Sequence, residues 1–272
     1  MRSTAFCLGL LLICPVAAAP PDRPILIAHR GMLRDAPENT LAAFAACVDL
    51  GLGFELDVRR TKDGVLVILH DDTVDRTTDG VGKIAELSLA EVKKLDAGRR
   101  FDPAFAGQLA PTLDDAFALL RDRKSNALVA VDLKISDATY EADIVALGNK
   151  CGVLPQLVFI GRAIDESAVR RKLREVDHRA QVCVLAQTTK DLSTAVADAE
   201  ASWVYARFVP TAEEAGVIRK AGKKLFLSGP PFNQYRPENF RTALLIRADV
   251  LLTDFPLECR RLWREGKSDD GR

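Results

Sequence analysis

The fold is decided by residues 54–71, which read FELDVRRTKDGVLVILHD. Two apolar runs, Phe54 to Val58 and Val65 to Leu69, flank the pair Asp63-Gly64, and this pair is a favoured two-residue hairpin turn. We therefore predict a strand that turns at Asp63-Gly64 and returns antiparallel to itself. Glu55 and Asp57 lie two residues apart on the first run, so their side chains point to the same side of the strand.

The pairing across this hairpin brings a histidine back to the two acids. A turn at Asp63-Gly64 places Asp57 opposite His70, whereas a turn at Lys62-Asp63 places Glu55 opposite His70. With either turn, we expect His70 to lie beside an acidic pair.

The rest of the chain alternates short apolar runs with longer amphipathic segments, a pattern typical of βαβ units around a parallel sheet. Apart from the returning hairpin run, the candidate strands are Ile25 to His29, Phe54 to Val58, Leu128 to Leu133, Leu157 to Ile160, Val182 to Leu185, Trp203 to Ala206, Lys224 to Leu227, and Val250 to Thr253. A closed barrel needs eight such strands. The predicted fold class is α/β, a TIM (β/α)8 barrel with a small insertion after the second strand and its hairpin.

Helical patterns lie between the candidate strands. Residues 39–50 and residues 166–175 each carry an apolar stripe at helical spacing. Thr112 and Thr211 each precede acidic residues, which favours a helix N-terminus at both places.

Residues 71–110 have no place in the barrel repeat. They are rich in Asp and Gly and contain a helix-like piece around Leu89 to Leu95, so we expect an insertion on the catalytic rim. We expect one domain over residues 19–264, followed by a disordered polar tail at 265–272.

The start of the chain resembles an export signal. Arg2 precedes an apolar run from Ala5 to Ala19 that ends in small residues, as in a secretory signal peptide. Cleavage is expected after Ala18, so that residues 1–18 are removed and the protein is periplasmic or secreted. The run is shorter than the roughly 20 apolar residues of a membrane span. Lipidation at Cys14 is another alternative, but it needs a small residue at the preceding position, and Ile13 is not small.

Composition narrows the possible partners. The 272 residues are 48% hydrophobic, which suits one large core but not two domains of typical size. The 38 lysine and arginine residues equal the 38 aspartate and glutamate residues, so no basic field favours nucleic acid.

Four cysteines remain after processing, widely spaced, and they do not require a disulfide. The oligomeric state stays open.

Acidic residues follow two of the predicted strands at the end where barrel enzymes place their reacting groups. Glu55 and Asp57 share one side of their strand, and Asp132 can add a third carboxylate from the next barrel strand. Like charges inside a barrel need a cation, and three oxygen ligands suit Mg²⁺ or Ca²⁺ better than Zn²⁺. The alternative is a solvated strand face, but apolar residues already occupy the other side of this strand.

Two of the three histidines, His29 and His70, also follow predicted strands and lie next to these acids. Two imidazoles can supply a base and an acid near neutral pH. Arg30 and Lys134 are cations at the same mouth, as a phosphate group would need. His178 lies in a charged loop and is expected at the surface.

The motifs, taken in order, resemble the signature of the glycerophosphodiester phosphodiesterase family, within the PLC-like phosphodiesterase superfamily. The matching residues are His29-Arg30-Gly31, Ala36-Pro37-Glu38-Asn39-Thr40, Glu55-Leu56-Asp57-Val58, Thr61-Lys62-Asp63-Gly64, His70-Asp71, Arg76-Thr77-Thr78, Pro111-Thr112-Leu113, and Thr253-Asp254-Phe255-Pro256. Each motif alone is weak. Their order and spacing, from the first strand to the last, make the resemblance specific.

The resemblance implies a TIM barrel that hydrolyses small-molecule glycerophosphodiesters to sn-glycerol 3-phosphate and an alcohol. It implies a divalent ion held by Glu55, Asp57 and Asp132, an acid-base pair of His29 and His70, and phosphate contacts from Arg30 and Lys134. By likeness to related phosphodiesterases, the glycerol 2-hydroxyl would attack phosphorus and form a cyclic phosphate, which water then opens.

Two positions depart from the family pattern. The third acid is usually glutamate, whereas this chain has Asp132, which is one methylene shorter. The family commonly shows a tryptophan and then Asn or Thr where this chain reads Phe226-Leu227-Ser228-Gly229-Pro230. Because the tryptophan shapes the alcohol pocket, preference for glycerophosphodiesters is less firmly implied than the reaction type.

Two other functions are compatible with parts of this pattern. A lysophospholipase-D-like enzyme would need an apolar groove at the mouth, for which Phe232, Tyr235 and Phe255 are the candidates. A non-catalytic binding protein would have lost a histidine or a metal acid, and this chain retains them all.

Overall fold

The structure is a computed structural model that describes residues 23–265. The expected signal peptide, residues 1–18, lies outside the described residues. So does the expected polar tail, apart from Glu265 at the end of the last helix. No helix in the described part is long and apolar enough to cross a membrane.

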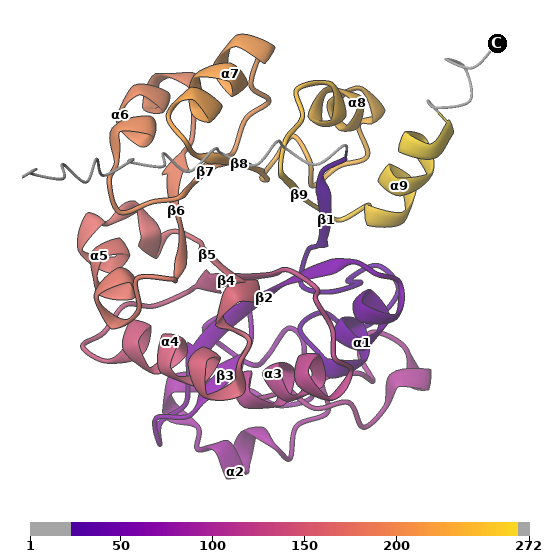
Figure 1. Ribbon diagram of the computed structural model, residues 1–272. Coiled ribbons are helices and arrows are strands. Elements are labelled where there is room, and N and C mark those ends of the chain that lie inside the picture. Colours follow the sequence, from indigo (N-terminus) through magenta and orange to yellow (C-terminus); the bar gives the residue numbers. More distant parts are fainter. Residues whose placement is uncertain (1–22, 266–272) are drawn as a thin grey trace, which may run out of the picture.

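Within residues 23–265, eight parallel strands close into a barrel. The third strand along the chain is not one of the eight; it pairs antiparallel with the second and lies outside the closed barrel. The strands are β1 (Ile25–Ala28), β2 (Gly53–Arg60), β3 (Leu66–Ile68), β4 (Val129–Leu133), β5 (Leu157–Ile160), β6 (Gln181–Ala186), β7 (Trp203–Ala206), β8 (Lys224–Leu227) and β9 (Val250–Thr253). Around the barrel they follow the order β1-β2-β4-β5-β6-β7-β8-β9, and β9 pairs again with β1 (Figure 1). The predicted TIM barrel is confirmed.

The helices form an outer ring around the strands, and α2 lies outside that ring (Figure 1). They are α1 (Leu41–Asp49), α2 (Leu89–Val92), α3 (Leu113–Asp122), α4 (Tyr140–Cys151), α5 (Ser167–Val176), α6 (Leu192–Ala197), α7 (Ala212–Lys220), α8 (Pro237–Leu245) and α9 (Pro256–Glu265). Thr112 and Thr211 cap α3 and α7 as predicted, because each side chain accepts a hydrogen bond from the backbone in the first turn.

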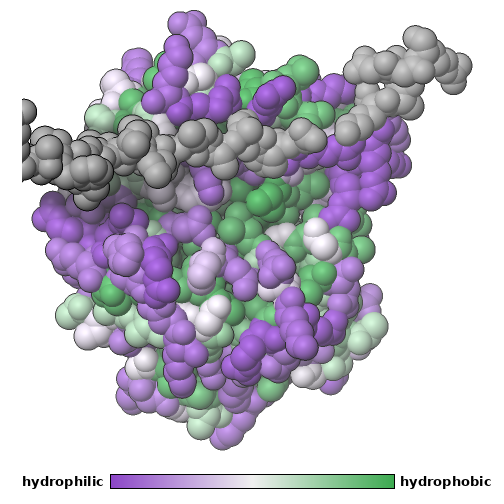
Figure 2. Space-filling view, viewed as in Figure 1, coloured by the Kyte–Doolittle hydropathy of each residue, from purple (hydrophilic) through white to green (hydrophobic). Residues whose placement is uncertain are grey.

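The core lies between the strands and the inner faces of these helices. Phe44 of α1 stacks on Phe54 of β2 with ring centroids 4.6 Å apart, and Val169 and Leu173 of α5 are buried. Figure 2 shows hydrophilic side chains over much of the outer helices and hydrophobic ones nearer the middle of this face. The helices therefore bury an apolar face against the strands and expose a polar face to water.

The hairpin forms, but its predicted register is wrong by one residue. Val58 lies opposite Ile68, and the Thr61 backbone N–H donates to the Val65 carbonyl at 2.9 Å. The loop therefore has three residues, Lys62 to Gly64, and Gly64 takes a left-handed backbone with φ of 85°. Leu69, not His70, bonds to the Asp57 backbone, and neither Asp57 nor Glu55 pairs with His70.

The inserted segment shares a small apolar cluster with the returning strand of the hairpin. Its buried members are Val67, Leu69, Val74, Ile84, Val92 and Ala110. Arg76 ties the start of the segment to the barrel end by binding Glu38 and Asp71 at 2.6–2.8 Å. The insertion therefore supports the segment that carries His70.

Candidate active site

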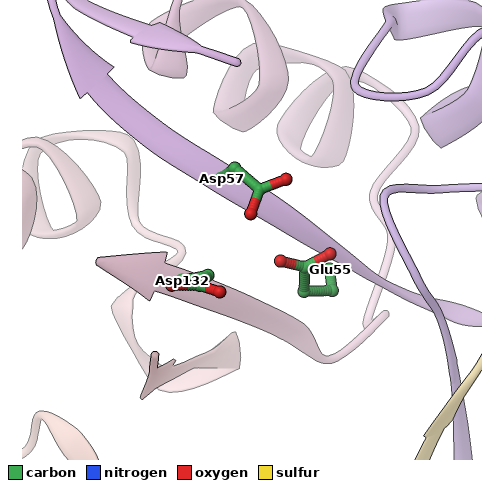
Figure 3. A group of neighbouring side chains, drawn as sticks. All are labelled: Glu55, Asp57 and Asp132. Carbon is green, nitrogen blue, oxygen red and sulfur yellow. The ribbon is translucent and has the colours of Figure 1, made fainter. Parts of the chain in front are cut away.

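Three carboxylates meet inside the barrel on two neighbouring strands. Asp57 of β2 is the register partner of Asp132 of β4, and Glu55 lies two residues before Asp57 (Figure 3). One oxygen atom of each residue lies within 4.8 Å of the others. Glu55 and Asp57 are 1% and 0% exposed, so the protein has removed adjacent negative charges from water.

Burial and mutual repulsion change the acidity of this cluster. Burial, Asp57 and Asp132 together raise the pKa of Glu55 well above its ordinary value. Burial also raises the pKa of Asp132. For Asp57, burial acts upward, but Lys134 and Arg30 hold its pKa below the ordinary value.

Two cations contact the acids directly. Lys134 Nζ lies 2.8 Å from Asp57 Oδ1 and 2.7 Å from Asp132 Oδ2. Arg30 Nε lies 3.7 Å from Asp57 Oδ2, its backbone N–H donates to Glu55 at 2.8 Å, and its side chain donates to Glu38 at 3.0 Å. Lys134 thus compensates two of the three carboxylates, and within residues 23–265 Glu55 receives only a backbone donor.

The residues around the cluster fit a divalent cation. Asp132 Oδ1 is buried and has no hydrogen-bond partner among the described residues. A Cβ at Gly161 would lie 2.2 Å from that oxygen, so glycine is required beside it. Asn39 Nδ2 donates to Asp57 at 2.7 Å and orients it. Hard carboxylate oxygens with a free lone pair match Mg²⁺ or Ca²⁺.

Each strand-end histidine is held by an aspartate. His29 Nδ1 lies 2.7 Å from Asp254, and His70 Nδ1 lies 2.7 Å from Asp71. A hydrogen bond from Arg76 holds the pKa of Asp71 well below its ordinary value, so Asp71 accepts and His70 Nδ1 carries the proton. In the described part of the chain, neither Nε2 has a protein partner, which leaves it available to a substrate.

These groups surround a cavity of about 790 Å³ at the carboxyl ends of the strands. Six of the predicted site residues line it: His29, Arg30, Glu55, His70, Asp132 and Lys134. Asp57 lies beneath them, fully buried. The structure therefore brings the whole predicted set together, and it leaves His178 exposed as expected.

The apolar groove that the lysophospholipase-D-like alternative would need does not form from the three aromatic residues. Phe232 is 0% exposed and belongs to the core. Tyr235 packs against Phe255, and Arg34 covers the Phe255 ring at 4.3 Å. None of the three lines the cavity.

Several residues that orient the proposed ligands and histidines had no predicted role. Asn39, Asp71 and Asp254 each bind a proposed ligand or histidine, and all three lie within the quoted motifs. Asp71 and Asp254 follow predicted strands, and Asn39 lies at the start of a predicted helix. Arg207, on the opposite wall, also directly follows a predicted strand, but it lies outside every quoted motif.

The fold and the site define a barrel enzyme with two histidines beside a buried carboxylate cluster. Residues 29–258 match the model of the "Glycerophosphoryl diester phosphodiesterase family". A glycerophosphodiester phosphodiesterase of Caldanaerobacter subterraneus is 34% identical over 90% of this chain and 99% of that protein. Glycerophosphodiester phosphodiesterase 1 of Bos taurus is 38% identical over 55% of this chain and 49% of that protein.

Solved structures agree with the sequence matches. The crystal structure of a glycerophosphodiester phosphodiesterase from Agrobacterium tumefaciens has a TM-score of 0.73 and 29% identity, covering 86% of this chain and 97% of that chain. The chain belongs to the glycerophosphoryl diester phosphodiesterase family, and it is an enzyme of the phosphoric diester hydrolase class.

Proposed function

We propose that this enzyme hydrolyses glycerophosphodiesters to sn-glycerol 3-phosphate and an alcohol with the help of a divalent cation. The observation that carries the proposal is the convergence of Glu55, Asp57 and Asp132 with His29 and His70 on one cavity. The relatives at 34% and 38% identity bear names that specify the same substrate class.

Glu55, Asp57 and Asp132 are the proposed ligands of Ca²⁺ or Mg²⁺. Such an ion supplies electrostatic stabilisation for the negative charge that develops on the phosphate oxygens. The high pKa of Glu55 supports this role, because burial beside Asp57 and Asp132 leaves its charged form under-compensated by protein groups.

His29 and His70 are the proposed acid-base pair. Each has its Nδ1 fixed by an aspartate, so each Nε2 can exchange a proton with the substrate. We assign removal of the proton from the attacking hydroxyl to His29 and protonation of the leaving alcohol to His70. Arg30 and Lys134, which line the cavity, are the proposed phosphate contacts.

Two further parts of the proposal rest on the sequence. The apolar segment near the start of the chain supports export of the enzyme to the periplasm or the medium. The attacking hydroxyl would be the glycerol 2-hydroxyl, and a cyclic phosphate would then be opened by water.

The test is release of sn-glycerol 3-phosphate from a panel of glycerophosphodiesters and lysophospholipids. We expect turnover of the water-soluble diesters and little or none of the lysophospholipids, because the aromatic candidates for an apolar groove do not line the cavity. Preferential cleavage of lysophospholipids would replace this function with the lysophospholipase-D-like one.

A further inference from the structure

We infer that Arg207 selects substrates whose alcohol carries an anionic group, such as the carboxylate of a serine head group. This inference rests on the proposed function, since it concerns the part of the substrate that the reaction releases. It would make Arg207 a specificity-determining residue on the wall opposite the acids.

Arg207 lies across the barrel mouth from the carboxylate cluster. It directly follows β7, and β7 is the fourth strand from β2 in either direction around the closed barrel. Both Arg207 and the cluster line the same cavity. A substrate with its phosphate at Glu55 and the histidines can therefore extend one end toward Arg207.

The backbone holds this arginine firmly while its charge stays unpaired. The Arg207 N–H donates to the Ala186 carbonyl at 2.9 Å. A Cβ at Gly229 would lie 3.2 Å from Arg207 Nε and 3.4 Å from Cζ, so the glycine admits the guanidinium to the wall. Across residues 23–265, no carboxylate forms an ion pair with Arg207 and no acceptor bonds to its side chain.

The other half-buried cations of the site, unlike Arg207, are paired with carboxylates. Arg30 binds Glu38 and the acids, and Lys134 binds Asp57 and Asp132. A half-buried guanidinium without a partner is poorly compensated, and its planar donors match a carboxylate or phosphate in two-point contact. Arg207 is thus available to bind an anionic group of a substrate.

The anion must lie in the alcohol part of the substrate. Glycerol is uncharged, and the proposed function assigns the scissile phosphate to the cation held by the cluster, to the histidines, and to Arg30 and Lys134. Arg162, Asp165 and Glu166, which follow β5, also line the cavity and are exposed. An amino acid head group, with one ammonium and one carboxylate, suits a cavity whose lining offers both signs.

Glycerophosphoserine and glycerophosphoethanolamine test this directly, because they differ by one carboxylate. We expect wild-type kcat/KM to be higher for glycerophosphoserine. Arg207→Gln should lower the serine-to-ethanolamine ratio on the order of 10-fold, the usual size of one lost charge-assisted hydrogen bond. Arg207→Met, which keeps the stem that packs on Gly229, should lower the ratio similarly and serves if the glutamine variant is unstable.

The control is Arg241→Gln, which removes an exposed arginine of α8 that does not line the cavity, and its ratio should equal the wild-type ratio. Equal losses on both substrates, or an unchanged ratio in the Arg207 variants, would overturn the inference alone. Absence of turnover of either diester by the wild-type enzyme would instead overturn the proposed function, and the inference with it.

Discussion

At the scale of single residues, Lys134 has a structural position that the sequence did not reveal. It was expected to contact phosphate, and its Nζ atom lies between Asp57 and Asp132 at 2.8 and 2.7 Å. Burial acts to lower the pKa of Lys134, but Asp132, Asp57 and Glu55 hold it above the ordinary value. Lys134 therefore stabilises the acidic cluster as well as facing the cavity.

Replacing Lys134 with Met should lower the free energy of unfolding of the metal-free enzyme by about 1–3 kcal/mol, because two carboxylates lose a charged partner. Under the metal proposal, saturating Ca²⁺ or Mg²⁺ should recover much of this loss. Urea denaturation in the presence and absence of the ion measures both quantities. Lys190→Met, at an exposed position, is the control and should change neither. A Lys134 variant as stable as wild type without metal would contradict this account.

The two histidines should respond differently to the leaving group. An ordinary alkoxide leaves poorly without a proton, so His70→Ala should slow hydrolysis of glycerophosphoethanolamine about 100-fold to 10,000-fold. The same variant should be much less impaired on the nitrophenyl ester of glycerol phosphate, because a nitrophenolate leaves without a proton. His29→Ala should be impaired on both substrates. Steady-state kinetics of the two variants on the two esters gives the comparison.

An equal loss on both substrates in both variants would show that the assignment of roles is wrong. The reverse pattern would keep the acid-base pair and exchange the two roles. Both imidazoles line the cavity and each has one ring nitrogen held by an aspartate, so the geometry is compatible with this exchange.

At the scale of elements, the strands and the helix starts at Thr112 and Thr211 could be predicted, and the hairpin register could not. Apolar runs such as Trp203 to Ala206 match their strands because a buried parallel strand must be apolar on both faces. The Asp63-Gly64 pair predicted a two-residue turn. In the structure, Asp63 instead accepts from Thr61 and from the Leu89 backbone, and these contacts belong to a longer loop.

Two glycines provide a matched test of the hairpin geometry. Gly64→Ala should lower the free energy of unfolding by about 1 kcal/mol, because φ is 85° there; an added Cβ meets no described atom within 4 Å, so backbone strain and not a clash sets this cost. Gly216→Ala, in α7 with equally open surroundings, should raise it by about 0.5–1 kcal/mol through helix propensity. Urea denaturation measures both values. Changes of the same sign would argue against the left-handed backbone at Gly64.

At the scale of the whole molecule, the catalytic end of the barrel was predictable and its opposite wall was not. Strand-end acids and histidines must converge in a closed parallel barrel, so their chain positions sufficed. Arg207 directly follows β7 but lies outside every quoted motif, and Phe232 lies in the loop after β8. Whether such side chains enter the core or the cavity depends on loop packing, which one sequence does not specify.

The two sides of the barrel mouth therefore have different proposed roles, one in the reaction and one in the choice of substrate. The β1, β2 and β4 side holds the proposed reaction chemistry, with His29, Glu55, Asp57 and Asp132 in place before a substrate binds. The β7 and β8 side holds Arg207 against Gly229. Reaction type and substrate choice can thus vary separately within the same fold.

Turnover of glycerophosphoethanolamine before and after chelation tests the central claim most directly. The purified enzyme is treated with a chelator, and Ca²⁺ or Mg²⁺ is then titrated back while sn-glycerol 3-phosphate is measured. With Glu55, Asp57 and Asp132 as the proposed ligands, we expect activity to disappear on chelation and to return with either ion, and Glu55→Gln to need a higher ion concentration. Full turnover by the metal-free enzyme would contradict the account.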